Sequence, residues 1–346
     1  MNGSVRAAVL HAARDLRVEE FAVAALGAGE VRLRVRNGGI CGSDLHYFQH
    51  GGFGTVRVQH PMVLGHEVAG EVLEVGSAVK RVRPGQKVAI NPSLPCNNCR
   101  FCLLGQQQHC LDMRFYGSAM RNPHVDGAFR EILVCTEAQA VPADMPSEQA
   151  AFAEPLAVCL HAAHQAGDLM GAKVLVTGAG PIGALLVMVA RAAGAAEIIA
   201  TDLIDAPLAI VRRMGADAAF NVRERPDALA PFAADKGQFD VVFEASGSAA
   251  ALATAFTVRR PRGVLVQVGN GNGEASVAMN VVVAKEFSLR GTFRFHAEFA
   301  QAVHALASGR MDVAPLLTEI IPLADAVRAF ELAGDRSRAM KVQLAF

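Results

Sequence analysis

The sequence predicts an α/β fold in which a β-rich first half precedes a doubly wound parallel sheet. The chain has 346 residues, more than one small core needs, and 52% of them are hydrophobic, which is typical of folded domains. Apolar and charged residues alternate in the first half, and from about Lys173 apolar segments alternate with Ala-rich segments. Strands that alternate with helices in this way indicate a parallel sheet with helices on both faces.

The first half has the pattern of short strands separated by tight turns. Residues 31–36 alternate Val or Leu with Arg, the period of two expected of a half-buried strand. Residues 68–75 and 86–90 have a similar character, and turn signals at 37–39 and 83–85 separate these segments. We therefore expect a β-rich unit with many loops.

The second half has the pattern of repeated strand and helix units. The expected strands are 174–177, 198–201, 218–221, 241–243, 264–268 and 287–290. The expected helices are 182–193, 207–214, 249–258, 298–308 and 324–333, followed by a strand-like segment at 341–346. The alternation of strands and helices up to Gly291 predicts a parallel sheet.

Charge and hydropathy exclude several classes of protein. The 33 Lys and Arg residues balance 33 Asp and Glu residues, so no surplus of cations favours a nucleic acid or an anionic membrane. The apolar run 174–190 contains three glycines and Pro181, so it is not a membrane span. His11 and Arg14 interrupt the N-terminal apolar stretch too early for a signal peptide. We therefore expect a cytoplasmic protein with neither a membrane nor a nucleic-acid partner.

Four of the seven cysteines lie close together in the sequence, at Cys96, Cys99, Cys102 and Cys110. A reducing cytoplasm favours metal binding over disulfides for such a cluster. Four thiolates can surround one Zn²⁺ without leaving an open position, which describes a structural site. An Fe–S cluster is a competing use of four cysteines, although the bacterial ferredoxin spacing is tighter at its end.

A glycine-rich turn follows the first strand of the second half. Gly178, Gly180 and Gly183 form a GxGxxG pattern between a predicted strand and a predicted helix. The first glycine permits the turn, the second permits close approach of a pyrophosphate, and the third permits packing of helix on sheet. Pro181 and Ile182 begin the helix, whose N-terminus favours phosphate groups. The pattern predicts a dinucleotide site.

An acidic residue ends the next predicted strand. Asp202 lies 19 residues after Gly183, where a carboxylate would accept hydrogen bonds from an adenosine ribose. Because a carboxylate repels a 2′-phosphate, NAD is the expected cofactor rather than NADP. Arg212 or Arg213 nearby could still admit NADP.

Three further residues suggest a second metal site. Cys41, His66 and Glu67 offer a thiolate, an imidazole and a carboxylate from separate loops of the β-rich half. Three mixed ligands with one open position describe a catalytic zinc, which can lower the pKa of a bound alcohol. Hydride from that alcohol would then pass to the nicotinamide.

Polar residues close to Cys41 could support this chemistry. Ser43 and His46 are candidates for carrying the released proton to solvent. Asp44 could hold the second ring nitrogen of His66. Cys135 and Cys159 remain as expected buried cysteines without a metal.

Taken together, these motifs resemble the zinc-dependent medium-chain dehydrogenase/reductase superfamily. The segment 65–70, followed by Gly76 and Val79, is similar to its zinc signature, and the cysteine and glycine motifs match as well. The resemblance implies a GroES-like catalytic domain at 1–149, completed by 295–346, and a Rossmann domain at 150–294. It places the active site in the cleft between the two domains.

Within the superfamily, the segment 153–156 is similar to the polyol dehydrogenase branch. That resemblance implies that Glu154 contacts the metal-bound water or substrate, or replaces Glu67 as a metal ligand. It also implies contacts with the substrate from Tyr47, Arg114, Glu154, Arg294 and Phe295. The implied cofactor contacts beyond the glycine turn and Asp202 are Val268, Gly269, Asn270, Thr292, Phe293 and Arg294. One departure is Asp205-Ala-Pro207, where related enzymes commonly have an arginine after the ribose-binding acid.

Several stretches resemble more closely those members of the branch that oxidise a sugar acid; they are 38–47, 112–120, 123–127, 152–157 and 161–167. A sugar acid requires a cation for its carboxylate, and Arg294, assisted by Arg114 or Arg121, could supply it. The alternatives are the same chemistry on an uncharged polyol and, remotely, a regulator that senses NADH and binds nucleic acid through the zinc lobe. The branch implies two Zn²⁺ per subunit and a homodimer or homotetramer.

Overall fold

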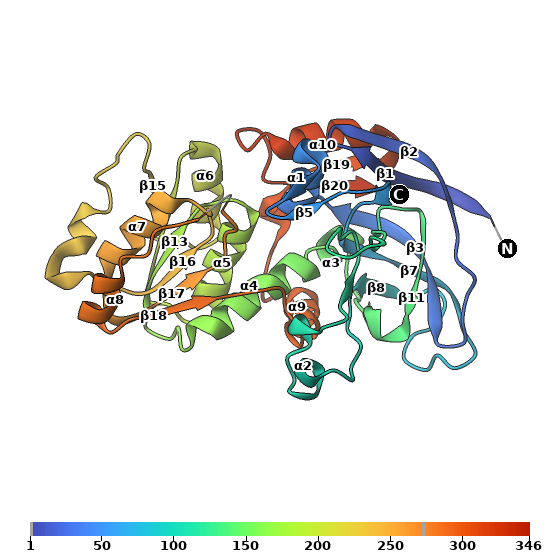
Figure 1. Ribbon diagram of the computed structural model, residues 1–346, viewed down its shortest axis with the longest axis horizontal. Helices are drawn as coiled ribbons and strands as arrows, with labels where there is room; N and C mark the ends of the chain where they lie inside the picture. Colours follow the sequence, from blue (N-terminus) through green and yellow to red (C-terminus); the bar gives the residue numbers. More distant parts are fainter. Residues whose placement is uncertain (1–2, 272–273) are drawn as a thin grey trace. The chain divides into compact units, whose positions relative to one another are not determined.

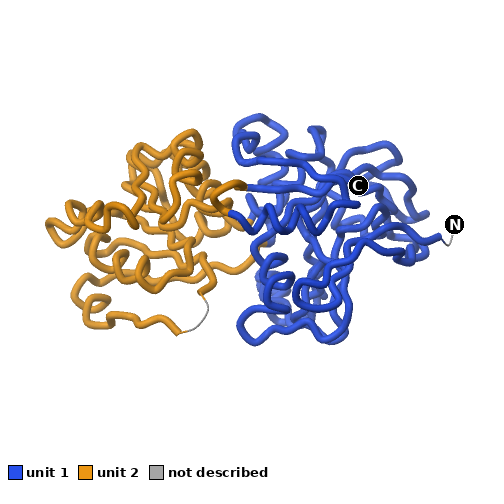
Figure 2. The backbone as a smooth tube through the Cα atoms, turned by 90° about the horizontal axis from the view of Figure 1, so that it is seen from above, with its two compact units in different colours: residues 1–157, 296–335, 341–346 blue, residues 158–295, 336–340 orange. Residues whose placement is uncertain are grey.

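The computed structural model describes residues 3–271 and 274–346 (Figure 1). The chain divides into two compact units, which Figure 2 shows in different colours. Unit 1 contains 1–157, 296–335 and 341–346, and unit 2 contains 158–295 and 336–340. The chain therefore leaves unit 1, forms most of unit 2, and returns to unit 1 before a short segment joins unit 2 again. The domain boundaries at 149/150 and 294/295 remain predictions.

Unit 1 contains most of the strands. They are β1 (Ser4–Ala12), β2 (Asp15–Ala22), β3 (Glu30–Gly39), β4 (Gly52–Phe53), β5 (Val56–Arg57), β6 (Met62–Val63), β7 (Glu67–Val75), β8 (Lys87–Ile90), β9 (Ser93–Leu94), β10 (Arg114–Phe115), β11 (Ile132–Thr136), β12 (Ala140–Pro142), β19 (Leu317–Pro322) and β20 (Lys341–Ala345). A seven-stranded sheet has the order β12-β8-β7-β3-β20-β19, and β11 also pairs with β3. A three-stranded sheet has the order β2-β1-β6.

The centre of the large sheet follows from the alternation in β3. Val31, Leu33 and Val35 are buried, whereas the intervening arginines lie at or near the surface. Strand β3 pairs with β7 on one side and with the C-terminal strand β20 on the other, as the blue and red strands of Figure 1 show. The sheet thus joins β3, from the first forty residues, to β20, about 300 residues later in the sequence.

Helices complete unit 1. They are α1 (Gly42–His50), α2 (Arg100–Leu103), α3 (Ser147–Ala150), α9 (Glu298–Ala307) and α10 (Ala326–Gly334), together with the first residues of α4 (Ala153–Ala166). The boundary between the units falls within α4. None of the described helices is long and apolar enough to cross a membrane.

Unit 2 is built on a six-stranded sheet. Its strands are β13 (Lys173–Thr177), β14 (Glu197–Asp202), β15 (Ala218–Asn221), β16 (Phe239–Glu244), β17 (Arg259–Gln267) and β18 (Ser288–Gly291). Its main helices are α5 (Pro181–Ala192), α6 (Asp205–Arg213), α7 (Ala249–Val258) and α8 (Met279–Lys285). The order is β15-β14-β13-β16-β17-β18, and every pairing is parallel. This is the doubly wound topology, with its switch point between β13 and β16.

The predicted fold class is confirmed, and its parallel sheet rests on apolar strands. Leu175, Val242 and Leu265 lie on three neighbouring strands and are fully buried in one core cluster. Continuous apolar strands are expected where helices cover both faces of a parallel sheet.

One helix of unit 1 was not among the predicted elements: the residues after Cys41 form α1. Glu67, expected in a loop, is the first residue of β7. The Asp44 carboxylate accepts the backbone N–H of Cys41 at 3.0 Å, and Gly51, with a φ of 68°, ends the helix. Both features are capping contacts, which a search for apolar periodicity does not detect.

Candidate active site and metal centres

Three potential metal ligands converge in unit 1. The ligand atoms of Cys41, His66 and Glu67 all lie within 4.8 Å of one another. Cys41 precedes α1, His66 lies just before β7, and Glu67 is the first residue of that strand. Pairing of Gly39 with Glu67 across β3 and β7 brings these segments together. The sheet register therefore builds the cluster.

Asp44 fixes the backbone around this cluster. Its side chain is fully buried, and its second carboxylate oxygen accepts the N–H of Gly65 at 3.2 Å. Its Oδ1 lies 3.7 Å from His66 Nδ1, a buried nitrogen that has no hydrogen-bond partner among residues 3–271 and 274–346. Asp44 was expected to hold the second ring nitrogen of His66; its carboxylate lies beside Nδ1, but the distance is longer than that of a hydrogen bond.

Lys341 forms an ion pair with Glu67 in the interior. Its ammonium group also donates to the carbonyl of Ile40 at 3.0 Å, and its side chain is 3% exposed. A Cβ at Gly39 would collide with the Glu67 carboxylate. Glycine is therefore needed at the end of β3, which lies between the strands of Glu67 and Lys341. A buried charge requires such a partner.

The charges of the cluster suit a divalent cation. Asp44, Glu67 and Glu154 are buried, and Lys341 is the cation placed among them. With Asp44 and Glu67 ionised, the cluster carries one more negative charge than Lys341 balances, and ionisation of Glu154 adds a second. Burial raises the pKa of Glu154 to about 8, an effect that nearby His66 opposes. A thiol, an imidazole and a carboxylate are ligands that Zn²⁺ accepts, so these residues fit a zinc site.

The predicted proton-carrying residues lie on α1. Burial raises the pKa of the Cys41 thiol, and the neighbouring Ser43 side chain acts in the opposite direction. Burial lowers the pKa of His46, and His50 lowers it further. Tyr47 is buried, and its hydroxyl oxygen accepts the N–H of Ala119 at 3.0 Å.

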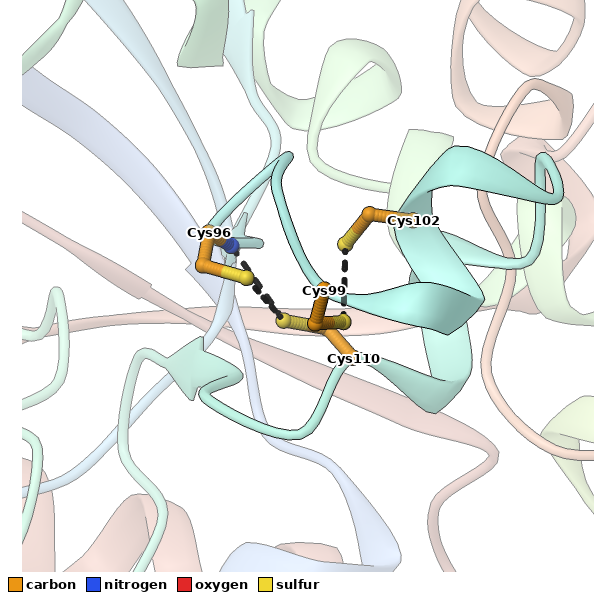
Figure 3. A group of neighbouring side chains, drawn as sticks. All are labelled: Cys96, Cys99, Cys102 and Cys110. Carbon is orange, nitrogen blue, oxygen red and sulfur yellow. Dashed lines mark hydrogen bonds between the residues drawn. The ribbon is translucent and has the colours of Figure 1, made fainter.

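The four-cysteine lobe brings its sulfur atoms together. All four Sγ atoms lie within 4.8 Å of one another (Figure 3). Sγ of Cys99 lies 3.6 Å from that of Cys102, and Sγ of Cys110 lies 3.4 Å from that of Cys96. A tetrahedral Zn²⁺ with Zn–S bonds of about 2.3 Å requires sulfur atoms about 3.8 Å apart. The lobe therefore fits a closed zinc site.

Backbone amides stabilise negative charge in this lobe. The N–H of Cys102 lowers the pKa of the Cys99 thiol to about 6, and the N–H of Leu111 contributes in the same direction. The backbone N–H groups of Cys96 and Asp112 point at Sγ of Cys110, at 3.2 and 3.3 Å. Such N–H···S contacts favour thiolates, the form that binds metal.

The predicted cofactor residues lie at one edge of the parallel sheet in unit 2. Gly178 follows β13, Asp202 ends β14, Val268 follows β17 and Thr292 follows β18. The register aligns these strand ends, because Thr177 is opposite both Thr201 and Glu244. Carboxyl ends of parallel strands next to a switch point are where such sheets bind nucleotides.

The three glycines of the turn are required for different reasons. Gly178 has a φ of 89°, and a Cβ there would contact the backbone of Ser246. A Cβ at Gly183 would collide with the carbonyl oxygen of Gly178. At Gly180, the residue before α5, Arg336 Nη2 is the one atom of the described residues that a Cβ would meet within 4 Å, at 3.9 Å. The chain leaves open space there, which fits a bound phosphate.

Asp202 connects this turn to β14. Its Oδ2 accepts the N–H of Ala179 at 2.7 Å, and its Oδ1 accepts the N–H of Leu203 at 2.7 Å. Arg336 Nη2 also donates to Oδ2, at 2.5 Å. Of the two arginines proposed from the sequence, Arg212 donates to the carbonyl of Ala219 and so packs α6 against β15.

The remaining predicted contacts are distributed over both units. In unit 1, Arg114 is exposed, and Arg121 forms an ion pair with Asp112. In unit 2, the guanidinium of Arg294 lies 4.9 Å from the centre of the Phe293 ring. The neighbouring Phe295 is buried, and Gly269 and Asn270 pack closely on Gly247.

Sequence reasoning missed Lys341 and Arg336. They lie 274 and 134 residues from their partners Glu67 and Asp202. Neither belongs to a local motif, since each reaches its partner through the return of the C-terminal segment. The one feature of the sequence that could have indicated such a contact is Lys341, a charged residue at the start of the strand-like segment 341–346.

Family models match both parts of the chain. Residues 27–146 match the alcohol dehydrogenase GroES-like domain, and residues 181–308 match the zinc-binding dehydrogenase domain. The chain belongs to the zinc-binding alcohol dehydrogenase family, and it is an oxidoreductase of α/β architecture. This confirms the superfamily predicted from the motifs.

Individual relatives refine this assignment. The chain is 46% identical over 316 residues to L-idonate 5-dehydrogenase (NAD(P)(+)) of Escherichia coli K12, covering 91% of each protein. It is 37% identical to human sorbitol dehydrogenase, covering 93% of this chain and 91% of that protein. The crystal structure of the Escherichia coli L-idonate 5-dehydrogenase matches with a TM-score of 0.96 and 43% identity, over 100% of this chain and 99% of that one.

Proposed function

We propose that this enzyme oxidises the C5 secondary alcohol of L-idonate to 5-keto-D-gluconate, reversibly, with NAD as the main hydride acceptor. The similarity to L-idonate 5-dehydrogenase over 91% of both chains carries the proposal. The clustering of Cys41, His66 and Glu67 supports its zinc-dependent chemistry. NADP is a second candidate acceptor, because the relative's name includes it.

In this proposal Cys41, His66 and Glu67 hold the catalytic zinc, with Glu154 as the alternative carboxylate. Zinc supplies Lewis acidity, which lowers the pKa of an alcohol. Ser43 and His46 carry the released proton to solvent, and Glu154 orients the reacting hydroxyl. Cys96, Cys99, Cys102 and Cys110 hold a second, structural zinc.

The substrate carboxylate is the feature that separates L-idonate from sorbitol. Arg294, assisted by Arg114 or Arg121, is proposed to bind that carboxylate, and Tyr47 and Phe295 to bind the carbon chain. An arginine fork binds a carboxylate more strongly than it binds a neutral hydroxyl.

Steady-state kinetics with both substrates test the proposal. Wild type should show a higher kcat/KM for L-idonate than for sorbitol, and Arg294→Ala should lose most of that preference. Arg294→Lys, which keeps the charge, should retain part of it. Equal kcat/KM for both substrates in wild type would instead favour a polyol dehydrogenase.

We further propose that the enzyme works in the cytoplasm as a homodimer or homotetramer, as the branch implies. Sedimentation equilibrium of the zinc-loaded protein tests the assembly, and a monomer at micromolar concentration would contradict it.

A further inference from the structure

Arg336 lies beside the acid expected to bind the cofactor ribose. Its Nη2 is 2.5 Å from Oδ2 of Asp202, whose side chain is 3% exposed. The Arg336 side chain itself is 48% exposed, so about half of its surface remains accessible to a ligand. The ion pair joins residues of unit 2 that are 134 positions apart.

The same guanidinium faces the phosphate end of the site. Its Nη2 lies 3.9 Å from the position that a Cβ would take at Gly180. Gly180 precedes α5, where free backbone N–H groups and the helix dipole favour anions. Arg336 is therefore close both to the ribose acid and to the open start of this helix.

Asp202 is held so firmly that it cannot turn away from an approaching anion. Its two oxygens accept the N–H groups of Ala179 and Leu203, both at 2.7 Å. An isolated carboxylate fixed at this position would repel a 2′-phosphate. The adjacent Arg336 offsets this charge and adds N–H donors suited to phosphate oxygens.

We propose that Arg336 is the residue that lets this site accept the 2′-phosphate of NADP beside Asp202. Paired with the carboxylate, it cancels the repulsion, and its exposed edge donates hydrogen bonds to the phosphate. The enzyme then uses both dinucleotides, and its use of NADP depends on this one side chain. The inference rests on the proposed function of unit 2 in binding a nicotinamide dinucleotide.

Direct binding measurements on the zinc-loaded, full-length protein test this inference. Fluorescence titration gives Kd for NADH and NADPH, and calorimetry gives Kd for 5′-AMP and 2′,5′-ADP. Arg336→Gln should weaken NADPH and 2′,5′-ADP by at least about 10-fold, the effect of losing a hydrogen bond to a charged group. It should change Kd for NADH and 5′-AMP by less than about 3-fold.

Two further variants serve as controls. Arg336→Lys keeps the charge and should restore part of the NADPH affinity. Arg338→Gln removes an exposed arginine two positions away and should leave all four affinities unchanged. Thermal melts of each variant show whether the loss of the Asp202 partner has disturbed the fold.

If Arg336→Gln weakened the binding of NADH and NADPH equally, the inference would be overturned, because Arg336 would then serve the pyrophosphate that both share. A variant in which neither affinity changes would also overturn it. Failure of wild type to bind NADH at all would contradict the proposed function itself, and so is distinguishable from both.

Discussion

Desolvation, and then the charge of Glu67, raise the pKa of the Cys41 thiol to about 12. A thiol in these surroundings loses its proton at neutral pH only where a cation compensates the new charge. At the proposed zinc site, we therefore expect metal binding and loss of the Cys41 thiol proton to occur together.

Cys41→Ser tests this dependence. Because a serine hydroxyl is a poor zinc ligand, the variant should lose activity by several orders of magnitude and retain one zinc per chain instead of two. Its circular dichroism spectrum should match that of wild type. A variant that kept both metal ions by mass spectrometry would show that Cys41 is not a ligand.

His46 allows a prediction about pH. Because burial and then His50 lower its pKa, the imidazole stays neutral, and able to accept a proton, at pH values below its usual 6.5. His46→Gln should lower kcat by about 100-fold, a typical contribution of a positioned proton acceptor. In wild type, the midpoint of the acid limb of the kcat/KM profile should lie at a pH below 6.5. Added imidazole should restore part of the variant's activity, and an unaltered kcat would exclude His46 from proton transfer.

At the scale of the element, two glycines of the turn before α5 are expected to serve different purposes, Gly180 cofactor binding and Gly183 folding. Gly180 has an ordinary φ of −66° and open space at its Cβ position, whereas a Cβ at Gly183 would collide with Gly178. Gly180→Ala should therefore keep its melting temperature but bind NADH at least about 10-fold more weakly. Gly183→Ala should lose about 1–3 kcal/mol of unfolding free energy or more, the usual cost of overpacking. The reverse pattern in urea melts and NADH titrations would refute this assignment.

The four-cysteine lobe provides a second prediction at this scale. Its longest helix, α2, has only four residues, so the lobe depends on its metal for order. Cys99→Ala should lower the melting temperature and remove one zinc per chain. Cys135→Ala removes a buried thiol elsewhere and should keep both zinc ions. Equal melting temperatures for Cys99→Ala and wild type would show that the lobe is not structural.

Most strands and helices of unit 2 were predictable because each depends on a continuous local pattern, although α8 was not predicted and β17 begins five residues earlier than expected. The segments 218–221 and 249–258 were predicted with the bounds that the structure shows. Helix α1 was not predictable in this way, because its stability depends on the side-chain contact from Asp44 and on the glycine that ends it. Arg336 was not predictable either, because a contact across 134 residues has no signature in a local window.

At the scale of the whole molecule, the two proposed zinc sites differ in how readily they lose metal. The four-cysteine site is closed, whereas the cluster around Cys41 offers three ligand side chains and an open position. Chelation should therefore abolish activity before it lowers the melting temperature. Time courses of activity, zinc content and thermal melts in the presence of phenanthroline would check this, and simultaneous loss of all three would contradict it.

The return of the chain to unit 1 has a consequence for synthesis on the ribosome. Strand β20 lies between β3 and β19, and Lys341 at its start pairs with Glu67, yet all of 158–295 is translated first. The nascent chain can complete the sheet of unit 2 while β3 still lacks β20. The pair that balances Glu67 forms only after β20 emerges, so the proposed catalytic zinc site matures later than the strands of unit 2 are made.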